Sequence, residues 1–353
     1  MISPPRHKQW SARTGPFVLT PTHFCRRLSN CCDATAIAEP VTGCAGGQRS
    51  PKRDRGTGFI TGAYRSVIRS FLFTVLLLAW TRSGAAQANS LSGAVNQSAD
   101  EQAKGVHNPL PPIWLLQFQQ NNYAEGMPSP VRGNRFQSNL LFQPLLPMKL
   151  NDDWRLVFRP VLTLFNTVPY LDQTMKIQRT TGFGDTIFAA ALSPRTTVVG
   201  SWLLALGPTF IFPTGGRELG QKKWQFGPFS AFGYRGEHFL AYVLSQQWLS
   251  IGGNGKTPTS QMSTTYSLVY FFKSGWTVGT QSQFSVNWEA ARGNKVAFPI
   301  GLQVGYLFHV GSLPVNVDLQ PEYYPVHPQN FGPKWNIQLQ VTPIIPIPIS
   351  GGY

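Results

Sequence analysis

The stretch WTVGTQSQFSVNW, from Trp276 to Trp288, decides the fold class of this sequence. Successive side chains of a β-strand point to opposite faces. One face of this stretch is therefore largely apolar, with tryptophan at both ends, and the other has only polar side chains and glycine. Twelve strand steps of about 3.3 Å, tilted by about 45°, cross roughly 28 Å, close to the apolar band of about 25 Å in an outer-membrane barrel. The stretch predicts a strand that crosses a lipid bilayer, with a tryptophan at each interface.

Composition restricts the fold further. Of the 353 residues, 13% are charged and 13% are aromatic, with 34 glycines and 29 prolines, whereas soluble domains average about 25% charged residues. Frequent glycine and proline disfavour helix-rich folds. The longest apolar run covers only residues 71–80, and a membrane-spanning helix needs about 20. These numbers exclude a helical membrane protein and favour a β-protein whose outer surface contacts lipid.

The alternation of Trp276–Trp288 recurs along the chain, for example at Trp154–Leu164, Val315–Tyr324 and Trp335–Thr342. Short and long connections between these segments alternate, as in outer-membrane barrels with both termini in the periplasm. The sequence therefore predicts an all-β fold, a transmembrane antiparallel up-and-down β-barrel of about twelve strands. The predicted strands are 113–121, 134–143, 154–165, 183–192, 199–212, 224–234, 239–250, 262–273, 276–288, 297–308, 313–324 and 335–345.

Two features leave the strand number open between ten and fourteen. Prolines fall inside several predicted strands although proline cannot donate to a β-ladder, and the segment 239–250 alternates poorly. The prolines are Pro160, Pro208, Pro228, Pro299, Pro321 and Pro343.

The region before the barrel has the layout of an export signal. Arg65 and Arg69 precede the apolar run 70–80, and Gly84-Ala85-Ala86 is a small-residue cleavage site. We therefore divide the chain into an overlong start or disordered extension (1–62), a signal peptide (63–86), a flexible periplasmic leader (87–112) and an outer-membrane barrel (113–353). Twelve basic and three acidic residues give segment 1–86 a net charge of +9 (12 − 3), so the +15 of the whole chain does not indicate nucleic-acid binding.

The polar strand faces carry Gln, Asn, Thr, Ser and Gly rather than Lys and Glu, which favours a narrow, water-containing lumen over an open soluble surface. Charged lumenal residues could either constrict the path and select ions or only pair with one another. The lumen and constriction candidates are Arg135, Arg155, Arg159, Asp185, Asp318 and Glu322. The polar lumenal wall is assigned to Gln281, Gln283, Asn287, Gln338 and Gln340, and the aromatic girdles to Trp154, Trp224, Trp276, Trp288 and Trp335.

The sequence contains none of the common catalytic patterns. His107, His238, His309 and His327 form no H-E-x-x-H or paired metal-ligand spacing, and there is no G-x-S-x-G elbow. The two carboxylates Asp318 and Glu322 are four strand positions apart, about 13 Å, too far for a catalytic dyad. We therefore predict no enzyme activity, no metal and no cofactor.

Four motifs carry a family resemblance. They are TTGFGDT at Thr180–Thr186, LGPTFIFPTGG at Leu206–Gly216, LGQKKWQFGPFSAFGY at Leu219–Tyr234 and QQWLSIGG at Gln246–Gly253. In this order they resemble the bacterial family described as "putative MetA-pathway of phenol degradation", over roughly Leu140–Pro343. The resemblance implies an outer-membrane transporter-like barrel linked to phenol and similar compounds.

The predicted function is an outer-membrane channel for passive uptake or efflux of small, hydrophobic or aromatic solutes. Its expected location is the outer membrane of a Gram-negative cell, and its expected partners are outer-membrane lipids, the outer-membrane assembly machinery and the solute. Two alternatives are a barrel enzyme that acts on lipids and a secreted soluble β-sandwich that binds carbohydrate.

Overall fold

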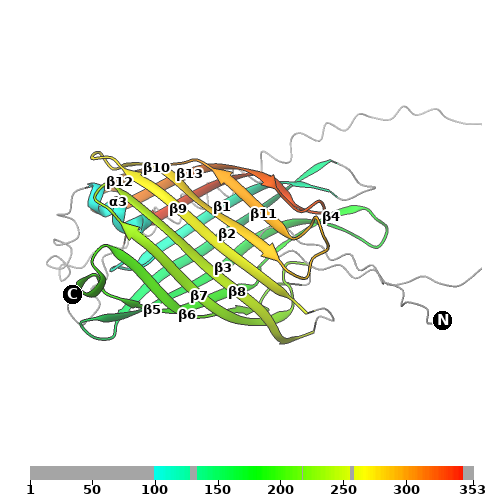
Figure 1. The fold of residues 1–353 in the computed structure, drawn as a ribbon. Helices are drawn as coiled ribbons and strands as arrows, with labels where there is room; N and C mark the ends of the chain where they lie inside the picture. Colours follow the sequence, from blue (N-terminus) through cyan, green and yellow to red (C-terminus); the bar gives the residue numbers. More distant parts are fainter. Residues whose placement is uncertain (1–98, 128–132, 217, 255–257, 345–353) are drawn as a thin grey trace, which may run out of the picture. The chain divides into compact units, whose positions relative to one another are not determined.

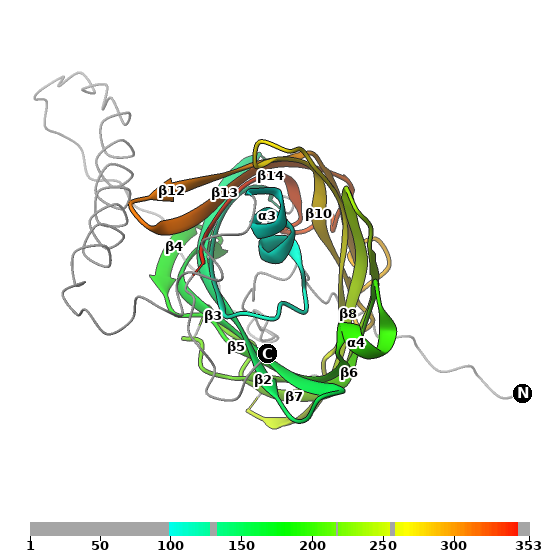
Figure 2. The same cartoon turned by 90° about the vertical axis from the view of Figure 1, so that its left-hand side faces the viewer.

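The computed structural model describes residues 99–127, 133–216, 218–254 and 258–344. Here the chain forms a closed antiparallel barrel of twelve wall strands, which is seen from the side in Figure 1 and along its axis in Figure 2. The predicted fold class is therefore confirmed. The predicted extension, the signal peptide and all four cysteines lie outside the described residues. No helix among the described residues is long and apolar enough to cross a membrane.

The described elements comprise fourteen strands and two helices. They are α3 (Ala99–His107), β1 (Leu115–Gly126), β2 (Asn134–Lys149), β3 (Trp154–Leu171), β4 (Ile177–Gly182), β5 (Thr186–Pro194), α4 (Thr196–Val199), β6 (Trp202–Phe212), β7 (Lys223–Arg235), β8 (Phe239–Gly253), β9 (Ser260–Phe271), β10 (Trp276–Asn287), β11 (Val296–Gly301), β12 (Gln303–Val310), β13 (Leu313–Val326) and β14 (Pro333–Pro343).

Fourteen strands make twelve wall positions because two positions are each shared by two strands. Strands β4 and β5 both pair with β3, and β11 and β12 both pair with β10 and β13. The barrel closes where β1 pairs with β14 on one side and with β2 on the other, for example through Phe118 with Val341 and with Phe142. Closure leaves no free strand edge.

Side chains alternate between the two faces of the wall at the start of β10 as the sequence predicted, but Ser282 and Val286, which were predicted to face outward, are buried. On β10, Trp276 and Val278 are 48% and 36% exposed, whereas Thr277 between them is fully buried. The large exposed apolar side chains of the other strands form a continuous outer surface that suits lipid, and they include Leu206, Phe232, Leu268 and Leu319.

The two ends of the barrel differ in their connections. One end, here the short-turn end, has the connections 150–153, 195–201, 236–238, 272–275 and 311–312, together with α3 and the start of β1. The opposite, long-loop end has longer connections, such as 213–222 and 288–295. In outer-membrane barrels, short turns face the periplasm and long loops face the exterior.

The features that left the strand number open are accommodated within the twelve positions. Pro208 and Pro228 face each other in the β6–β7 register, and Pro160 lies opposite Phe188. Pro299 lies in β11 near the interruption at Leu302 that separates β11 from β12. The segment that alternates poorly in sequence is a regular strand, β8, whose side chains alternate in burial.

The segment before β1 differs from the flexible leader expected at 87–112. Residues Ala99–His107 form helix α3, which lies inside the ring of strands in Figure 2. Its side chains Ala103 and Val106 are fully buried. The barrel interior encloses the helix, because Gln102, Lys104 and His107 are buried as well, and such packing stabilises a helix too short to be stable alone.

Candidate functional site

The interior of the barrel has two chemically different walls. On β1, the inward side chains that follow Leu115 along the strand are Gln117, Gln119, Asn121, Tyr123 and Glu125. On β8, which is six positions away in the ring of twelve, they begin with Leu240, Tyr242 and Leu244 and end with Gln246 and Trp248. The sequence predicted polar lumenal walls with scattered charges and aromatic side chains, so the extended apolar wall is a correction to that prediction.

The apolar wall covers the short-turn half of several strands, and α3 lies against β9, β10 and β12. Ala103 and Leu110 pack in one buried cluster with side chains of β3 and of β5–β9. The cluster includes the small residues Ala189, Ala191 and Ala205 on β5 and β6. The wall side chains of this cluster also include Val157, Leu203, Phe229, Ala231, Leu240, Tyr242, Leu244, Val269 and Phe271.

Polar contacts attach both ends of α3 to the wall. Near its first turn, Glu101 accepts hydrogen bonds from Lys104 Nζ at 2.6 Å and from Arg235 Nη2 of β7 at 2.8 Å. At its last residue, His107 Nε2 lies 3.5 Å from Asp318 Oδ1 on β13 and 3.5 Å from Thr277 Oγ1 on β10. One polar contact with the wall therefore lies near each end of the helix.

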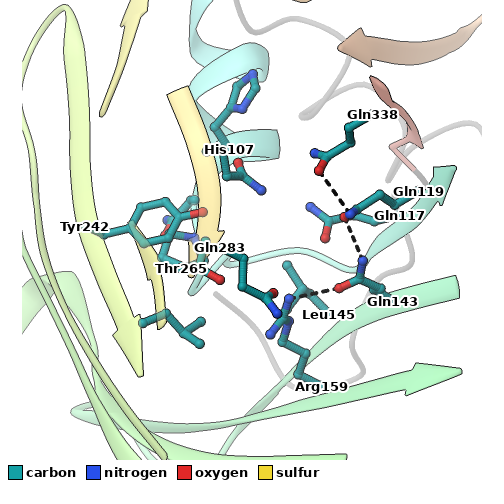
Figure 3. Close-up of a pocket in the computed structure, with 14 residues that line it drawn as sticks. His107, Gln117, Gln119, Gln143, Leu145, Arg159, Tyr242, Thr265, Gln283 and Gln338 are labelled. Carbon is teal, nitrogen blue, oxygen red and sulfur yellow. Dashed lines mark hydrogen bonds between the residues drawn. The ribbon is translucent and has the colours of Figure 1, made fainter. Parts of the chain in front are cut away.

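A chamber lies between the segment that follows α3 and the barrel wall (Figure 3). We call it the lumenal chamber. It is small, with a cavity volume of about 50 Å³, which is below the range of about 300–1,000 Å³ for sites of drug-sized ligands. Its lining residues are His107, Asn108, Pro109, Gln117, Gln119, Gln143, Leu145, Arg159, Tyr242, Leu244, Thr265, Gln281, Gln283 and Gln338.

A chain of hydrogen bonds between side chains runs across the polar wall of the chamber (Figure 3). Arg159 Nη2 on β3 donates to Gln143 Oε1 at 2.9 Å. Gln143 Nε2 then donates to Gln119 Oε1 at 2.8 Å, and Gln119 Nε2 donates to Gln338 Oε1 at 3.1 Å. In each of these amides the oxygen accepts the hydrogen bond that comes from the direction of Arg159. The aligned amide dipoles therefore stabilise the guanidinium without neutralising its charge.

The ion pairs expected among the lumenal charges do not form. Within the described part of the chain, neither Arg155 nor Arg159 pairs with a carboxylate, and the only ion-pair contact of Asp318 is with His107. Glu322 instead accepts hydrogen bonds from neutral groups of Ser282, Gln320, Asn336 and Tyr324. The sequence placed these charges on the inner face, but strand order and stagger decide which of them meet.

Asp185, another predicted constriction residue, is engaged by a loop. Its Oδ1 accepts from the Gly215 amide at 2.8 Å and its Oδ2 from the Gln221 amide at 2.7 Å. A Cβ on Gly220 would lie 2.3 Å from Asp185 Oδ1, so glycine is required for this approach. The GFGD and PTGG motifs therefore hold connection 213–222 against the start of β5.

The remaining predicted lumen residues are distributed along the barrel. Arg135 lies at the rim of the long-loop end and donates to the Asn134 carbonyl, and Arg155 is buried near the short-turn end. Asn287 accepts from the Glu289 amide in the turn after β10. Gln281, Gln283 and Gln338 line the chamber, and Gln340 is buried in the adjacent polar wall.

The five tryptophans assigned to girdles are all exposed on the outer face, between 39% and 54%. Trp154 and Trp276 begin strands at the short-turn end, whereas Trp224, Trp288 and Trp335 lie at the long-loop end. Two separated belts are the expected positions of interfacial tryptophans.

The contact of His107, Asp318 and Thr277 is not a catalytic triad. In a triad the base uses one ring nitrogen for the nucleophile and the other for the orienting carboxylate. Here both 3.5 Å contacts go to Nε2, and Nδ1 has no hydrogen-bond partner. In the described part of the chain, no three His, Cys, Asp or Glu side chains form a metal-binding group.

Sequence reasoning missed the residues of the apolar wall and α3. Tyr242, Leu244 and His107 line the chamber but were not candidates, because the predicted lumenal walls were mainly polar. A signal was present: both alternating faces of β8 are apolar near Leu240, which a strand between lipid and water would not show.

The closed antiparallel barrel, with an apolar outside and a chamber inside, defines the class of this protein as a transmembrane β-barrel. The chain belongs to the family described as "Putative MetA-pathway of phenol degradation", whose model matches residues 123–325. This confirms the resemblance drawn from the sequence motifs. No curated protein sequence matches the chain.

Solved structures of outer-membrane proteins are similar to this chain. An outer membrane channel from Pseudomonas putida F1 shares 14% identity over 66% of this chain and 94% of its own, with a TM-score of 0.48. The NanC porin shares 10% identity over 65% of this chain and 98% of its own, with a TM-score of 0.40. The outer membrane phospholipase of Salmonella typhi shares 13% identity over 70% and 97%, with a TM-score of 0.31.

Proposed function

We propose that the protein is an outer-membrane channel through which small amphipathic solutes pass by passive diffusion. The observation that carries this proposal is the lumenal chamber between one polar and one apolar wall. A polar wall alone would suit ions and sugars, and an apolar wall alone would exclude water. Both walls together suit a solute that has a polar group on a small hydrophobic body.

The width of the barrel supports a selective path rather than a wide one. Barrels of about eight strands fill with side chains, and those of 16 to 18 strands leave an open aqueous channel. Twelve strands lie between these sizes, and here α3 takes up part of the interior (Figure 2). We infer that solutes must pass beside α3 or displace it at the short-turn end.

The description of the family agrees with this solute class, because phenol is an aromatic ring with one polar group. The lumen supplies a physical reason for such a preference. Tyr242 and Leu244 face the chamber from the apolar side, and Gln119 and Gln143 face it from the polar side.

Reconstitution tests the proposal. Purified protein, checked as an intact barrel by its heat-modifiable migration on gels, should give discrete conductance steps in planar bilayers. A soluble, periplasmic protein without conductance would contradict the proposal and restore the secreted binding protein as the better account. Release of fatty acid from phospholipid by the pure barrel would favour the enzyme alternative instead.

A further inference from the structure

Arg159 is the most unusual group in the chamber. It is a cation in the middle of the transmembrane barrel, and no carboxylate of the described residues forms an ion pair with it. A charge removed from bulk water is costly unless it is paired or hydrogen-bonded. Its one described hydrogen bond goes to the neutral Gln143 Oε1.

The N–H donors of Arg159 that Gln143 does not use favour an anionic ligand. A guanidinium has five N–H donors in a planar fork, and Gln143 takes one from Nη2. The side chain is only partly buried, and it lines the chamber. The fork geometry matches a carboxylate, which can accept two parallel hydrogen bonds from it.

The chain of amides sets the charge balance of the site. Because Gln143, Gln119 and Gln338 are neutral, they hold the arginine without cancelling its charge. Neither lumenal carboxylate forms an ion pair with Arg159: Asp318 lies beside His107, which also lines the chamber, and Glu322 accepts four neutral donors. The chamber therefore carries an unneutralised positive charge.

Apolar side chains fix the rest of the ligand. Leu145, Tyr242 and Leu244 line the same chamber as Arg159. An inorganic anion would leave these surfaces in contact with water, whereas an organic anion would cover them. Burial of an apolar body against them adds affinity in proportion to the area removed from water.

We propose that the lumenal chamber binds a small organic carboxylate, with its charge on Arg159 and its apolar body against Tyr242 and Leu244. This proposal rests on the proposed function and narrows it, because it specifies that a solute bound in the channel during passage is an anion. Arg159 is then the residue that decides specificity among amphipathic solutes of similar size.

Equilibrium binding of sodium benzoate to the intact barrel in detergent at pH 7 tests this proposal, with isothermal titration calorimetry as the readout. The wild-type protein should bind benzoate saturably, and Arg159→Gln should weaken binding about tenfold or more, as expected for loss of a charged hydrogen-bond partner. Arg159→Lys keeps the charge without the fork and should bind with intermediate affinity.

Arg155→Gln is the matched control. Arg155 lies on the same strand and the same face, four residues earlier, and does not line the chamber. It should retain benzoate affinity within about twofold, because screened charges beyond contact distance contribute little. Benzyl alcohol, the neutral relative of benzoate, should bind the wild type and Arg159→Gln equally weakly.

Three results would overturn the proposal. They are unchanged benzoate affinity in a correctly assembled Arg159→Gln barrel, an equal loss in Arg155→Gln, and displacement of benzoate by equimolar sodium chloride. Conductance separates this failure from failure of the channel itself: a barrel that conducts but does not bind benzoate refutes only the carboxylate site.

Discussion

The inward faces of β1 and β8 lie opposite each other in the barrel and have opposite chemistry. β1 presents amides and a carboxylate, whereas the first half of β8 presents Leu240, Tyr242 and Leu244. The outward faces of both strands meet the same lipid, so the difference reflects what each strand meets inside. Both strands line the chamber, but β1 carries part of the chain of amides, whereas β8 packs in the apolar cluster that includes Ala103 of α3. The residues on the inward face of a strand thus match what lies inside the barrel, and those on the outward face match the lipid.

The largest expected effect comes from reversing the inside–outside pattern on β10. Phe284 packs on Phe298 of β11, with ring centroids 5.8 Å apart, and Gln283 lines the chamber. Phe284→Arg should prevent assembly, because an arginine on the lipid face near the bilayer centre costs about 2–4 kcal/mol. Heat-modifiable gel migration of outer-membrane fractions measures the assembled fraction.

Gln283→Arg is the control for that prediction. It introduces the same side chain one residue away, on the inward face, and should assemble normally while it alters conductance. Equal behaviour of the two variants would contradict the register of β10.

The next effect concerns the contacts that hold α3 against the inner wall. Glu101→Gln together with Asp318→Asn removes a charge at each end of the helix without changing side-chain size. The double variant should open more often in single-channel recordings, because the helix keeps its apolar packing but loses the Asp318–His107 contact and a partly exposed ion pair worth about 0.2–1 kcal/mol. An unchanged open probability would show that apolar packing alone fixes the helix.

A smaller effect is expected on ion selectivity. Arg155 and Arg159 have no acidic partner among the described residues, so they make the inner wall of β3 positive. Replacement of both by Gln should shift the reversal potential in a salt gradient toward cations. The shift should shrink at high salt, because the Debye length falls from about 10 Å at 0.1 M to about 3 Å at 1 M. An unchanged reversal potential in assembled barrels would remove these arginines from the conduction path.

The smallest effect lies outside the membrane, in the connection between β3 and β4. Hydrogen bonds from the side chains of Thr174 and Gln178 and from the Lys176 amide lower the pKa of Asp172 to about 2. Because the pKa is lowered in the folded state, the ionised carboxylate stabilises this loop at pH values above its ordinary pKa of about 3.9. The contribution is lost as the pH falls toward 2. Carboxyl NMR titration should show a midpoint near 2 that rises in Thr174→Ala, and an unshifted midpoint would contradict the hydrogen-bond arrangement.

The comparison of β1 and β8 also shows how far the sequence could predict the structure. Strict alternation, as at Trp276–Trp288, predicted the strands, and each predicted strand corresponds to a wall position. The alternation was weak at 239–250 because both faces of β8 are apolar there. The alternation along β3 predicted that Arg159 faces inward. Its hydrogen-bond partner Gln143 could not be inferred, because that contact depends on the register of β2 and β3 around a bulge near Leu140.

Helix α3 was the main element that the sequence did not reveal. Its nine residues are polar on average, and an isolated helix of this length is marginal in water. Its stability comes from the inner wall, which exists only once the barrel has closed. No local pattern between Ala99 and His107 could have indicated that surface.

Single-channel conductance of the barrel with and without α3 tests the central claim most directly. Deletion of residues 99–110 removes the helix and Leu110 but leaves β1 intact. We expect the deleted protein to assemble with the same heat-modifiable migration and to conduct at least about twice as much current as the full chain, because the apolar wall would then border open lumen. Equal conductance of the two assembled proteins would contradict the account that solutes cross this barrel along a lumenal path narrowed by α3.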